Sequence, residues 1–201
     1  MRLFGERGYA ATTVAQIEAA AGLSPGAGGL YAHFSSKEAV LRAGLEAILT
    51  PNPGLPLDTD PADSRVGAAH APALTERLEE IARAGLVRLD HDRDFNRILV
   101  RDLRTVPDLL QLAADREIRP IHDRLAALLT RLASHPELDS QALAAVLIGA
   151  TTHLWLLTDI YGAHPAGVTQ EAYLQALVRC AAAALGPKTN SSMSDGNGPN
   201  Q

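Results

Sequence analysis

Apolar residues recur at helical spacing along most of this chain of 201 residues, and sustained alternation of apolar and polar residues is nearly absent. Alternation is the pattern of a half-buried β-strand, whereas a repeat of three to four residues is typical of an amphipathic helix. The pattern therefore predicts an all-α fold. After Pro72 one such stripe is formed by Leu74, Leu78, Ile81, Ala82, Leu86 and Leu89.

Several of the predicted helices have recognisable ends. Asp92 is placed to cap the helix that follows it. A long helix over residues 118–132 must accommodate Pro120, which either kinks the helix or lies in its first turn. The last helix is expected to begin after a cap at Thr169 and to end at Gly186.

One stretch of the chain cannot be a long helix. Residues 50–67, "TPNPGLPLDTDPADSRVG", contain four prolines and two glycines. This break predicts an N-terminal domain at 1–49, a linker at 50–70 and a larger helical domain at 71–186. Residues 187–201 are polar and rich in Gly, Asn and Ser, so we expect a disordered tail.

Composition and charge limit the possible functions. With 46% apolar and 20% charged residues the chain is ordinary for a globular protein. It has no apolar run of eighteen residues and no signal-peptide pattern, so a soluble, cytoplasmic protein without a membrane partner is expected. Cys180, the lone cysteine, is expected to be a small buried residue. A net charge of −5 offers no basic surface for phosphates, so DNA binding must be argued from geometry.

The first 49 residues contain three short helical patterns separated by turn signals. The middle pattern, "TTVAQIEAAAG", starts with Thr12 or Thr13 as its N-cap and ends at Gly22. Short helices joined by a glycine turn form the layout of a helix-turn-helix, whose second element enters the major groove of DNA. The residues of the middle helix expected to face inward are Val14, Ile17 and Ala21.

Residues 3–41 resemble the DNA-binding domain of the TetR (tetracycline repressor) family of bacterial regulators. The matching pieces are "LF..RG...TTV..I...AG.S.G", "LY.HF" and "SKE.L", a coherent series over nearly all of this range. The resemblance implies a ligand-responsive, DNA-binding transcriptional regulator, most often a repressor. No cofactor is expected.

The chain departs from the family pattern at two places. Family members usually have four residues between the apolar residue after the turn glycine and the "LY" pair, whereas this chain has six, residues 24–29. The two additional residues enlarge the recognition element. Ser24 can cap a helix here, and Pro25 suits the first position of that helix. The glycines predict that this segment is weakly ordered without DNA. The first helix is also shorter than in the family, and this truncation predicts reduced DNA affinity.

By this resemblance, one set of residues is expected to face DNA. Their chemistry suits the phosphate backbone better than base edges, because the segment has no Arg, Asn or Gln for bidentate base contacts. Lys37 is the best phosphate candidate, whereas Tyr31 can equally be a core residue. The set comprises Thr13, Ser24, Gly26, Ala27, Tyr31, His33 and Lys37.

The larger domain resembles the family's ligand-binding and dimerisation domain by layout. Segment 139–161 is apolar on almost every side, which predicts contact on two faces, and segment 169–186 carries a stripe of small residues. The two segments are expected to pair with those of a second copy. A homodimer would place two recognition elements about one DNA turn apart on a near-palindromic operator, and an effector would shift this spacing and release the DNA.

Polar and aromatic groups within the apolar helices are candidates for the ligand pocket, although each can instead be a core, dimer or surface residue. The run "LDHDRDF" concentrates acidic residues and a histidine, but neighbours on a helix point to different sides, so a cap with solvated charges is favoured over a metal site. The run "RDLRTV" is expected to form surface or interdomain ion pairs. The pocket candidates are Phe95, Arg101, His122, His153, Trp155, Asp159 and Tyr161.

Two other functions compete with a regulator. A small-molecule-binding or scaffold dimer with a degenerate DNA-binding head is favoured by the short first helix and the inserted glycines. An enzyme is not expected, because no Ser/His/Asp set, metal-ligand spacing or phosphate-binding glycine loop after a strand is present.

Overall fold

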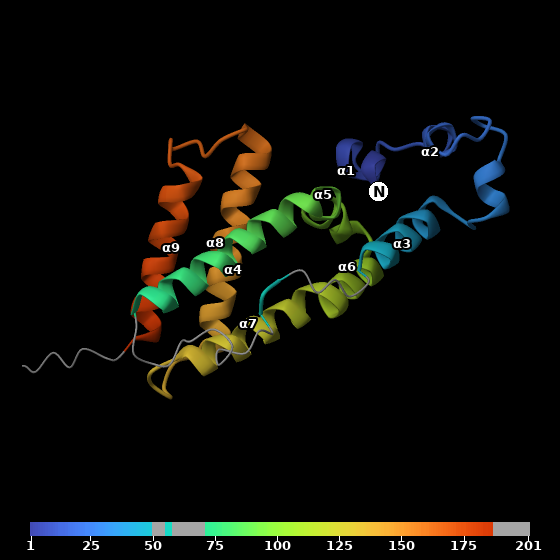
Figure 1. Ribbon diagram of the computed structural model, residues 1–201. Helices are drawn as coiled ribbons and strands as arrows, with labels where there is room; N and C mark the ends of the chain where they lie inside the picture. Colours follow the sequence, from blue (N-terminus) through green and yellow to red (C-terminus); the bar gives the residue numbers. More distant parts are fainter. Residues whose placement is uncertain (50–54, 58–70, 187–201) are drawn as a thin grey trace, which may run out of the picture.

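The structure is a computed structural model that describes residues 1–49, 55–57 and 71–186, and these residues form an all-α fold, as predicted (Figure 1). Most of the predicted linker and the whole predicted tail lie outside the described residues. One end of the molecule is formed by α1 (Arg2–Arg7), α2 (Val14–Ala20), the 3₁₀ helix η1 (Gly29–Ala32) and α3 (Lys37–Ile48). The rest comprises α4 (Ala71–His91), α5 (Arg93–Arg101), η2 (Leu103–Thr105), α6 (Pro107–Ala113), the π-helical turn η3 (Ala114–Ile118), α7 (Arg119–Leu132), α8 (Ser140–Tyr161) and α9 (Gln170–Leu185).

Helix α2 begins at a capping box. The Thr13 hydroxyl accepts a hydrogen bond from the Gln16 N–H at 3.3 Å, and the Gln16 side-chain oxygen accepts from the Thr13 N–H at 2.9 Å. Thr13, rather than Thr12, is therefore the N-cap. Of the residues expected to face inward, Val14 and Ile17 are half-buried, but Ala21 is exposed because it lies beyond the last turn.

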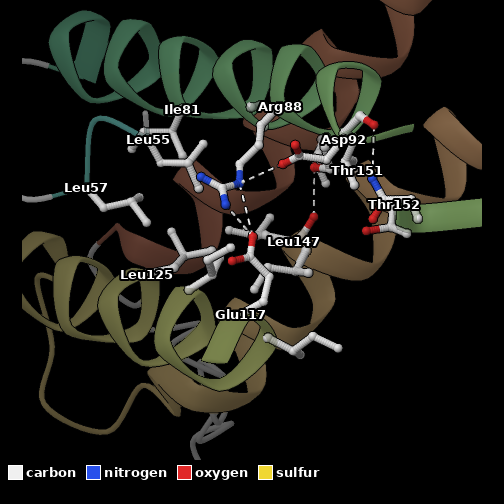
Figure 2. A pocket seen from close by; sticks show the side chains of 18 of the residues that line it. Leu55, Leu57, Ile81, Arg88, Asp92, Glu117, Leu125, Leu147, Thr151 and Thr152 are labelled. Atoms are coloured by element: carbon white, nitrogen blue, oxygen red, sulfur yellow. Dashed lines mark hydrogen bonds and ion pairs between the residues drawn. The ribbon is translucent and has the colours of Figure 1, made fainter. Parts of the chain in front are cut away.

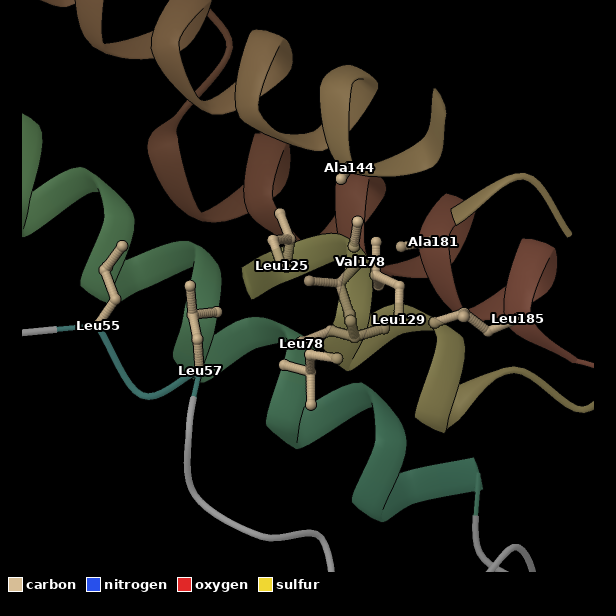
Figure 3. Close-up of a cluster of buried hydrophobic side chains, with 11 residues drawn as sticks. Leu55, Leu57, Leu78, Leu125, Leu129, Ala144, Val178, Ala181 and Leu185 are labelled. Atoms are coloured by element: carbon tan, nitrogen blue, oxygen red, sulfur yellow. The ribbon is translucent and has the colours of Figure 1, made fainter. Parts of the chain in front are cut away.

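The core of the larger domain packs α4 against α7, α8 and α9 (Figure 3). Leu78, Leu129 and Val178 are buried there, and each fully buried leucine contributes about 1.5–3 kcal/mol relative to exposure. Leu55 and Leu57 lie within the predicted linker, yet both are buried in the same cluster. This part of the linker range thus supplies core residues to the larger domain.

Helices α6 and α7 are joined through η3 into one continuous helix. Pro120 lies in the first turn of α7, one of the two predicted placements. Proline cannot donate a hydrogen bond to the carbonyl four residues earlier, and its ring clashes with that carbonyl in a regular helix. The wider π turn directly before it accommodates the proline without ending the helix. As a result, residues 107–132 form one continuous helical element.

Helices α8 and α9 lie side by side at the end of the molecule far from α1 and α2 (Figure 1). As predicted, Thr169 caps α9, and its hydroxyl accepts from the Ala172 N–H at 3.2 Å. The prediction for Cys180 is wrong, because this side chain is exposed. The inward stripe of α9 contains Leu174, Val178 and Ala181, and Cys180 points to the opposite side.

Helix α8 carries more apolar surface than the protomer buries. Among the helices that the structure describes, it alone is long and apolar enough to cross a membrane, by length and composition only. Only 22% of its most apolar window is buried. Its exposed residues include apolar or small ones at Ala142, Val146 and Gly149, which recur three or four positions apart. The full exposed set is Gln141, Ala142, Ala145, Val146, Gly149, His153, Thr158, Ile160 and Tyr161.

The N-terminal helices and the larger domain share one buried cluster. Phe4 of α1 and Leu41 of α3 pack with Ile98 of α5 and Leu109 of α6. In addition, the Arg101 guanidinium donates hydrogen bonds to the carbonyl oxygens of Phe4 at 2.7 Å and Gly5 at 3.1 Å. Because these carbonyls belong to the C-terminal half of α1, Arg101 caps that helix from the other domain.

Helices α1 and α5 approach each other closely at Gly5, which leads to a stability prediction. A Cβ atom at Gly5 would lie 2.8 Å from the Cα atom of Asp94, a backbone contact that no side-chain rotation relieves. We expect Gly5→Ala to lower the free energy of unfolding by about 1–3 kcal/mol, as overpacking does elsewhere. Urea denaturation followed by circular dichroism measures the change. Gly85→Ala is the matched control, since a Cβ there would meet only the Thr151 Cγ2 atom at 3.5 Å, an ordinary van der Waals contact, and a helical alanine is favoured over glycine. An equal loss in both variants would contradict the close-contact explanation.

Candidate DNA-binding surface and ligand cavity

The recognition segment, residues 22–33, contains no α-helix. A turn closes with the Ala27 N–H donating to the Ser24 carbonyl at 3.2 Å, and the single 3₁₀ helix η1 follows. The expectation that Ser24 caps a helix beginning at Pro25 is therefore wrong. Gly26 and Gly28 have φ angles of +79° and +77°, which disfavour any residue with a side chain and break a right-handed helix.

Glu18 organises this segment from behind. Its side chain is fully buried, and its two carboxylate oxygens accept hydrogen bonds from the Gly26 N–H at 2.7 Å and the Leu30 N–H at 3.0 Å. The bond from Leu30, followed by that from Gly26, holds the pKa of the Glu18 carboxyl below its usual value. The inserted residues are thus anchored to α2 by one carboxylate, and these two N–H groups are not free for phosphates.

Six of the seven residues expected to face DNA are exposed in the N-terminal domain. Tyr31 is 56% exposed and makes no contribution to the core, which removes the alternative placement for this residue. Thr13, Ser24, Gly26, Ala27 and His33 are also exposed.

Lys37 differs from the others because it is half-buried. Its ammonium group donates hydrogen bonds to the carbonyl oxygens of Tyr9 at 2.8 Å and Thr12 at 3.0 Å, and it lies 4.4 Å from the centre of the Tyr9 ring. An ammonium group has three N–H donors, so one remains available for a phosphate. Lys37 therefore holds the segment before α2 in addition to any DNA contact.

A cavity of about 280 Å³ lies within the larger domain, between α4, α5, α7, α8 and α9 (Figure 2). Most of its wall is aliphatic, and Leu55 and Leu57 close one side together with Leu125. Cavities of a few hundred Å³ with apolar walls and a few polar groups are typical of small-molecule sites.

The polar end of the cavity consists of one basic and two acidic side chains. Arg88 of α4 lies between Asp92 and Glu117 (Figure 2). The Arg88 Nε atom is 3.1 Å from Glu117 Oε1 and 3.6 Å from Asp92 Oδ2. Asp92 occupies the predicted N-cap position of α5, but its side chain makes no capping hydrogen bond and instead faces Arg88.

One residue belongs both to the cavity wall and to the cluster shared by the two domains. Phe95, on α5, lines the cavity and is buried against Phe4 and Leu41 of the N-terminal domain. Leu99, one turn further on, has the same two roles. A molecule in the cavity would therefore press on side chains that also support α1 and α3.

Comparison with known proteins identifies the N-terminal domain. Residues 1–43 match the family described as bacterial regulatory proteins, tetR family. The match covers the N-terminal domain, which is similar to the DNA-binding domain of that family. A domain of this kind supports a role in DNA-binding transcriptional regulation.

Two further comparisons add no information on the function of this chain. No curated protein matches the chain significantly. The crystal structure of a TetR-family transcriptional regulator from Pectobacterium atrosepticum is similar over 92% of this chain and 84% of that chain, with 23% sequence identity and a TM-score of 0.42.

Among the seven pocket candidates, only Phe95 lines the cavity. Asp159 forms ion pairs with Arg93 and Arg97. Arg101 donates a hydrogen bond to the Phe4 carbonyl of α1. His122 contacts the Gln141 carbonyl at 3.0 Å. Trp155 is buried in a separate cluster between α4, α8 and α9, while His153 and Tyr161 are exposed on α8. These six residues are polar or aromatic groups within apolar segments, but none of them lines the cavity.

The acidic run at the junction of α4 and α5 is dispersed, but the expectation of a cap with solvated charges is only partly correct, because Asp92 makes no capping bond and is largely buried. Asp90 pairs with Arg93, Asp92 turns to the cavity, and Asp94 lies against Gly5. Within the described ranges, no three His, Cys, Asp or Glu side chains converge on a possible metal ion. In the neighbouring run "RDLRTV", Arg101 forms an ion pair with Asp102 at 3.0 Å, while its interdomain contacts are hydrogen bonds to carbonyl oxygens rather than ion pairs.

Three important residues were missed by the sequence interpretation. Glu18 stands in an apolar helix, where a single acidic residue is a signal of a buried, bonded carboxylate. Arg88 and Glu117 are 29 residues apart, and nothing in their local sequences indicates that they meet.

Proposed function

We propose that this chain is a cytoplasmic repressor of the TetR family that binds a near-palindromic operator as a homodimer and is released from it by a small-molecule effector in the cavity. The observation that carries the proposal is the double role of Phe95. Because this side chain lines the cavity and supports the DNA-binding helices, an effector can favour one arrangement of the two domains over another.

The dimer is proposed to form through the exposed faces of α8 and α9. On α8 the exposed stripe includes Val146 and Ile160, which are 62% and 60% exposed in the single chain. Such a contiguous apolar face is unusual on a monomer and typical of an interface core. On α9 the exposed small residues that can let a second helix approach are Ala172, Ala176, Cys180 and Ala183.

The DNA contacts are proposed to be made by the exposed recognition segment and the residues beside it. Thr13, Ser24 and Lys37 are suited to phosphates, and Tyr31 and His33 are suited to the groove. Gly26 and Ala27 form the tip of the turn, where small residues permit close approach of the backbone to DNA. The proposed order along the chain is a DNA-binding domain at 1–49, a linker at 50–70, an effector and dimerisation domain at 71–186 and a tail at 187–201.

Selection of bound sequences from a random duplex pool, at low and then moderate salt, tests this function. We expect enrichment of a near-palindrome, with binding that falls steeply as salt rises. Enrichment of a single half-site without symmetry would contradict the homodimer. If nothing is enriched, the chain is instead a small-molecule-binding dimer with a degenerate DNA-binding head, which the lack of a recognition α-helix would explain.

A further inference from the structure

The cavity has an excess of negative charge at its polar end. Among the described residues that line it, Arg88 is the one base, and Asp92 and Glu117 are the two acids, so these three side chains sum to one negative charge. They are only 14%, 18% and 17% exposed. Water therefore screens this charge much less than it would on the surface.

The two carboxylates are not equally engaged by Arg88. The guanidinium directs both its Nε and an Nη atom to the same oxygen of Glu117. Among the described residues, the Asp92 carboxylate has the longer ion contact of 3.6 Å to Arg88, and it makes no capping bond to α5. Asp92 and the second oxygen of Glu117 can thus accept from a further donor in the cavity.

The neutral polar groups of the wall also offer acceptors. The Thr151 hydroxyl donates to the Leu147 carbonyl at 2.9 Å, and the Asn96 amide nitrogen donates to the Leu89 carbonyl at 2.9 Å. The single hydroxyl hydrogen of Thr151 is thereby used, so Thr151 can only accept from a ligand, whereas Asn96 keeps an acceptor oxygen and a second amide N–H. The cavity therefore has acceptors and net negative charge at one end and aliphatic walls elsewhere.

We propose that the effector is an organic cation, with an apolar body against the aliphatic walls and a cationic N–H-bearing head against Asp92 and Glu117. This inference rests on the proposed function, since it names the chemical class of the effector. A carboxylate ligand would face two acids while Arg88 is already paired, and a neutral ligand would leave the excess charge uncompensated. The volume of about 280 Å³ restricts the body to a small aliphatic or single-ring group.

Three probes of equal chain length test the charge preference: octylammonium, octanol and octanoate. Their binding to the full-length protein is measured by isothermal titration calorimetry at neutral pH. We expect octylammonium to bind at least tenfold more tightly than octanol, and octanoate to bind least. Equal affinity for octylammonium and octanol, or a preference for octanoate, would overturn the inference.

Substitutions in the cavity test whether the preference for the cation depends on Asp92 and Glu117. Asp92→Asn and Glu117→Gln each remove one negative charge, so each is expected to reduce octylammonium binding about tenfold and to leave octanol binding unchanged. The double variant removes both carboxylates of the polar end and is expected to lose the preference for octylammonium over octanol. Octanol binding serves as the readout of an intact cavity. Asp90→Asn is the matched control, because Asp90 is exposed on α4 and pairs with Arg93 outside the cavity.

The outcomes separate this inference from the proposed function. Binding of octanol without a preference for the cation leaves an effector cavity in place but makes the ligand class wrong. If none of the probes binds while the duplex pool still yields an operator, the inference fails and DNA binding stands. Release of the selected operator by octylammonium, and not by octanoate, would support both.

Discussion

Replacing Glu18 with alanine is expected to lower the affinity for the selected operator by tenfold or more. The Glu18 carboxylate holds the recognition segment through the N–H groups of Gly26 and Leu30. Without it, two N–H groups lose a charged acceptor in a buried site, and the glycine-rich segment gains freedom that binding must remove. Fluorescence anisotropy with a labelled operator duplex measures the loss.

The direction of the change in operator affinity distinguishes a loss of order in the recognition segment from the simple loss of a negative charge. Removing a negative charge near DNA would by itself strengthen binding, so a weaker complex must come from lost order in the segment. Glu6→Ala is the matched control, since Glu6 is an exposed acid of α1 in the same domain. Glu18→Gln keeps one acceptor oxygen and should fall between the wild type and Glu18→Ala. If Glu18→Ala and Glu6→Ala have the same affinity, Glu18 has no positioning role.

Acid titration gives a second readout of the same contact. Because the folded-state pKa of Glu18 is lowered, its contribution to stability is fully present above the unfolded-state pKa, about 4.3, and is lost as pH falls through the lower folded value. The amide resonances of Gly26 and Leu30 should therefore be constant near neutral pH and move together only in acid. If these resonances moved between about pH 6 and about pH 8, a group other than Glu18 would have to cause the movement.

Val146→Glu is expected to convert the homodimer into a monomer and to lower operator affinity by about a hundredfold or more. Val146 is 62% exposed in the single chain, so a glutamate can reach solvent in the monomer without loss of core packing. In the proposed dimer the same carboxylates would be buried in an apolar interface and would face each other across the two-fold axis. A monomer must hold its operator through one half-site, which removes the gain from linked binding.

Analytical ultracentrifugation measures the mass, and anisotropy measures the affinity. Val87→Glu is the matched control, because Val87 is an exposed valine of α4, 71% exposed, outside the α8 and α9 faces. The control should remain dimeric and bind the operator normally. A dimeric Val146→Glu variant would show that the exposed face of α8 is not the interface.

Helix positions were accessible from the sequence because they depend on local properties. The period of apolar residues, the cap at Thr169 and the restriction at Pro120 each involve residues within one or two turns of the chain. Thr13 at the start of α2 is of the same kind. The all-α fold followed from such local signals, whereas the DNA-binding domain followed from the resemblance of residues 3–41 to the TetR family.

The recognition segment shows where local signals were insufficient. Ser24 and Pro25 favour the start of a helix, but a carboxylate from α2 competes for the backbone N–H groups that would follow. Glu18 is eight positions from Gly26 and twelve from Leu30, and the intervening turn at Gly22 decides whether they meet. A tertiary hydrogen bond therefore overrode a local preference.

The sequence by itself determined that this chain is helical, where most of its helices begin and end, and that its first 43 residues are similar to the DNA-binding domain of the TetR family. Only the tertiary structure decided which side chains share a site. Arg88 meets Asp92 through one helical turn, but it meets Glu117 only because α4 packs against η3, and Phe95 joins the cavity to the DNA-binding helices only because α5 lies between them. Packing between distant helices depends on the fit of many side chains at once, so periodicity along one segment carries no record of it.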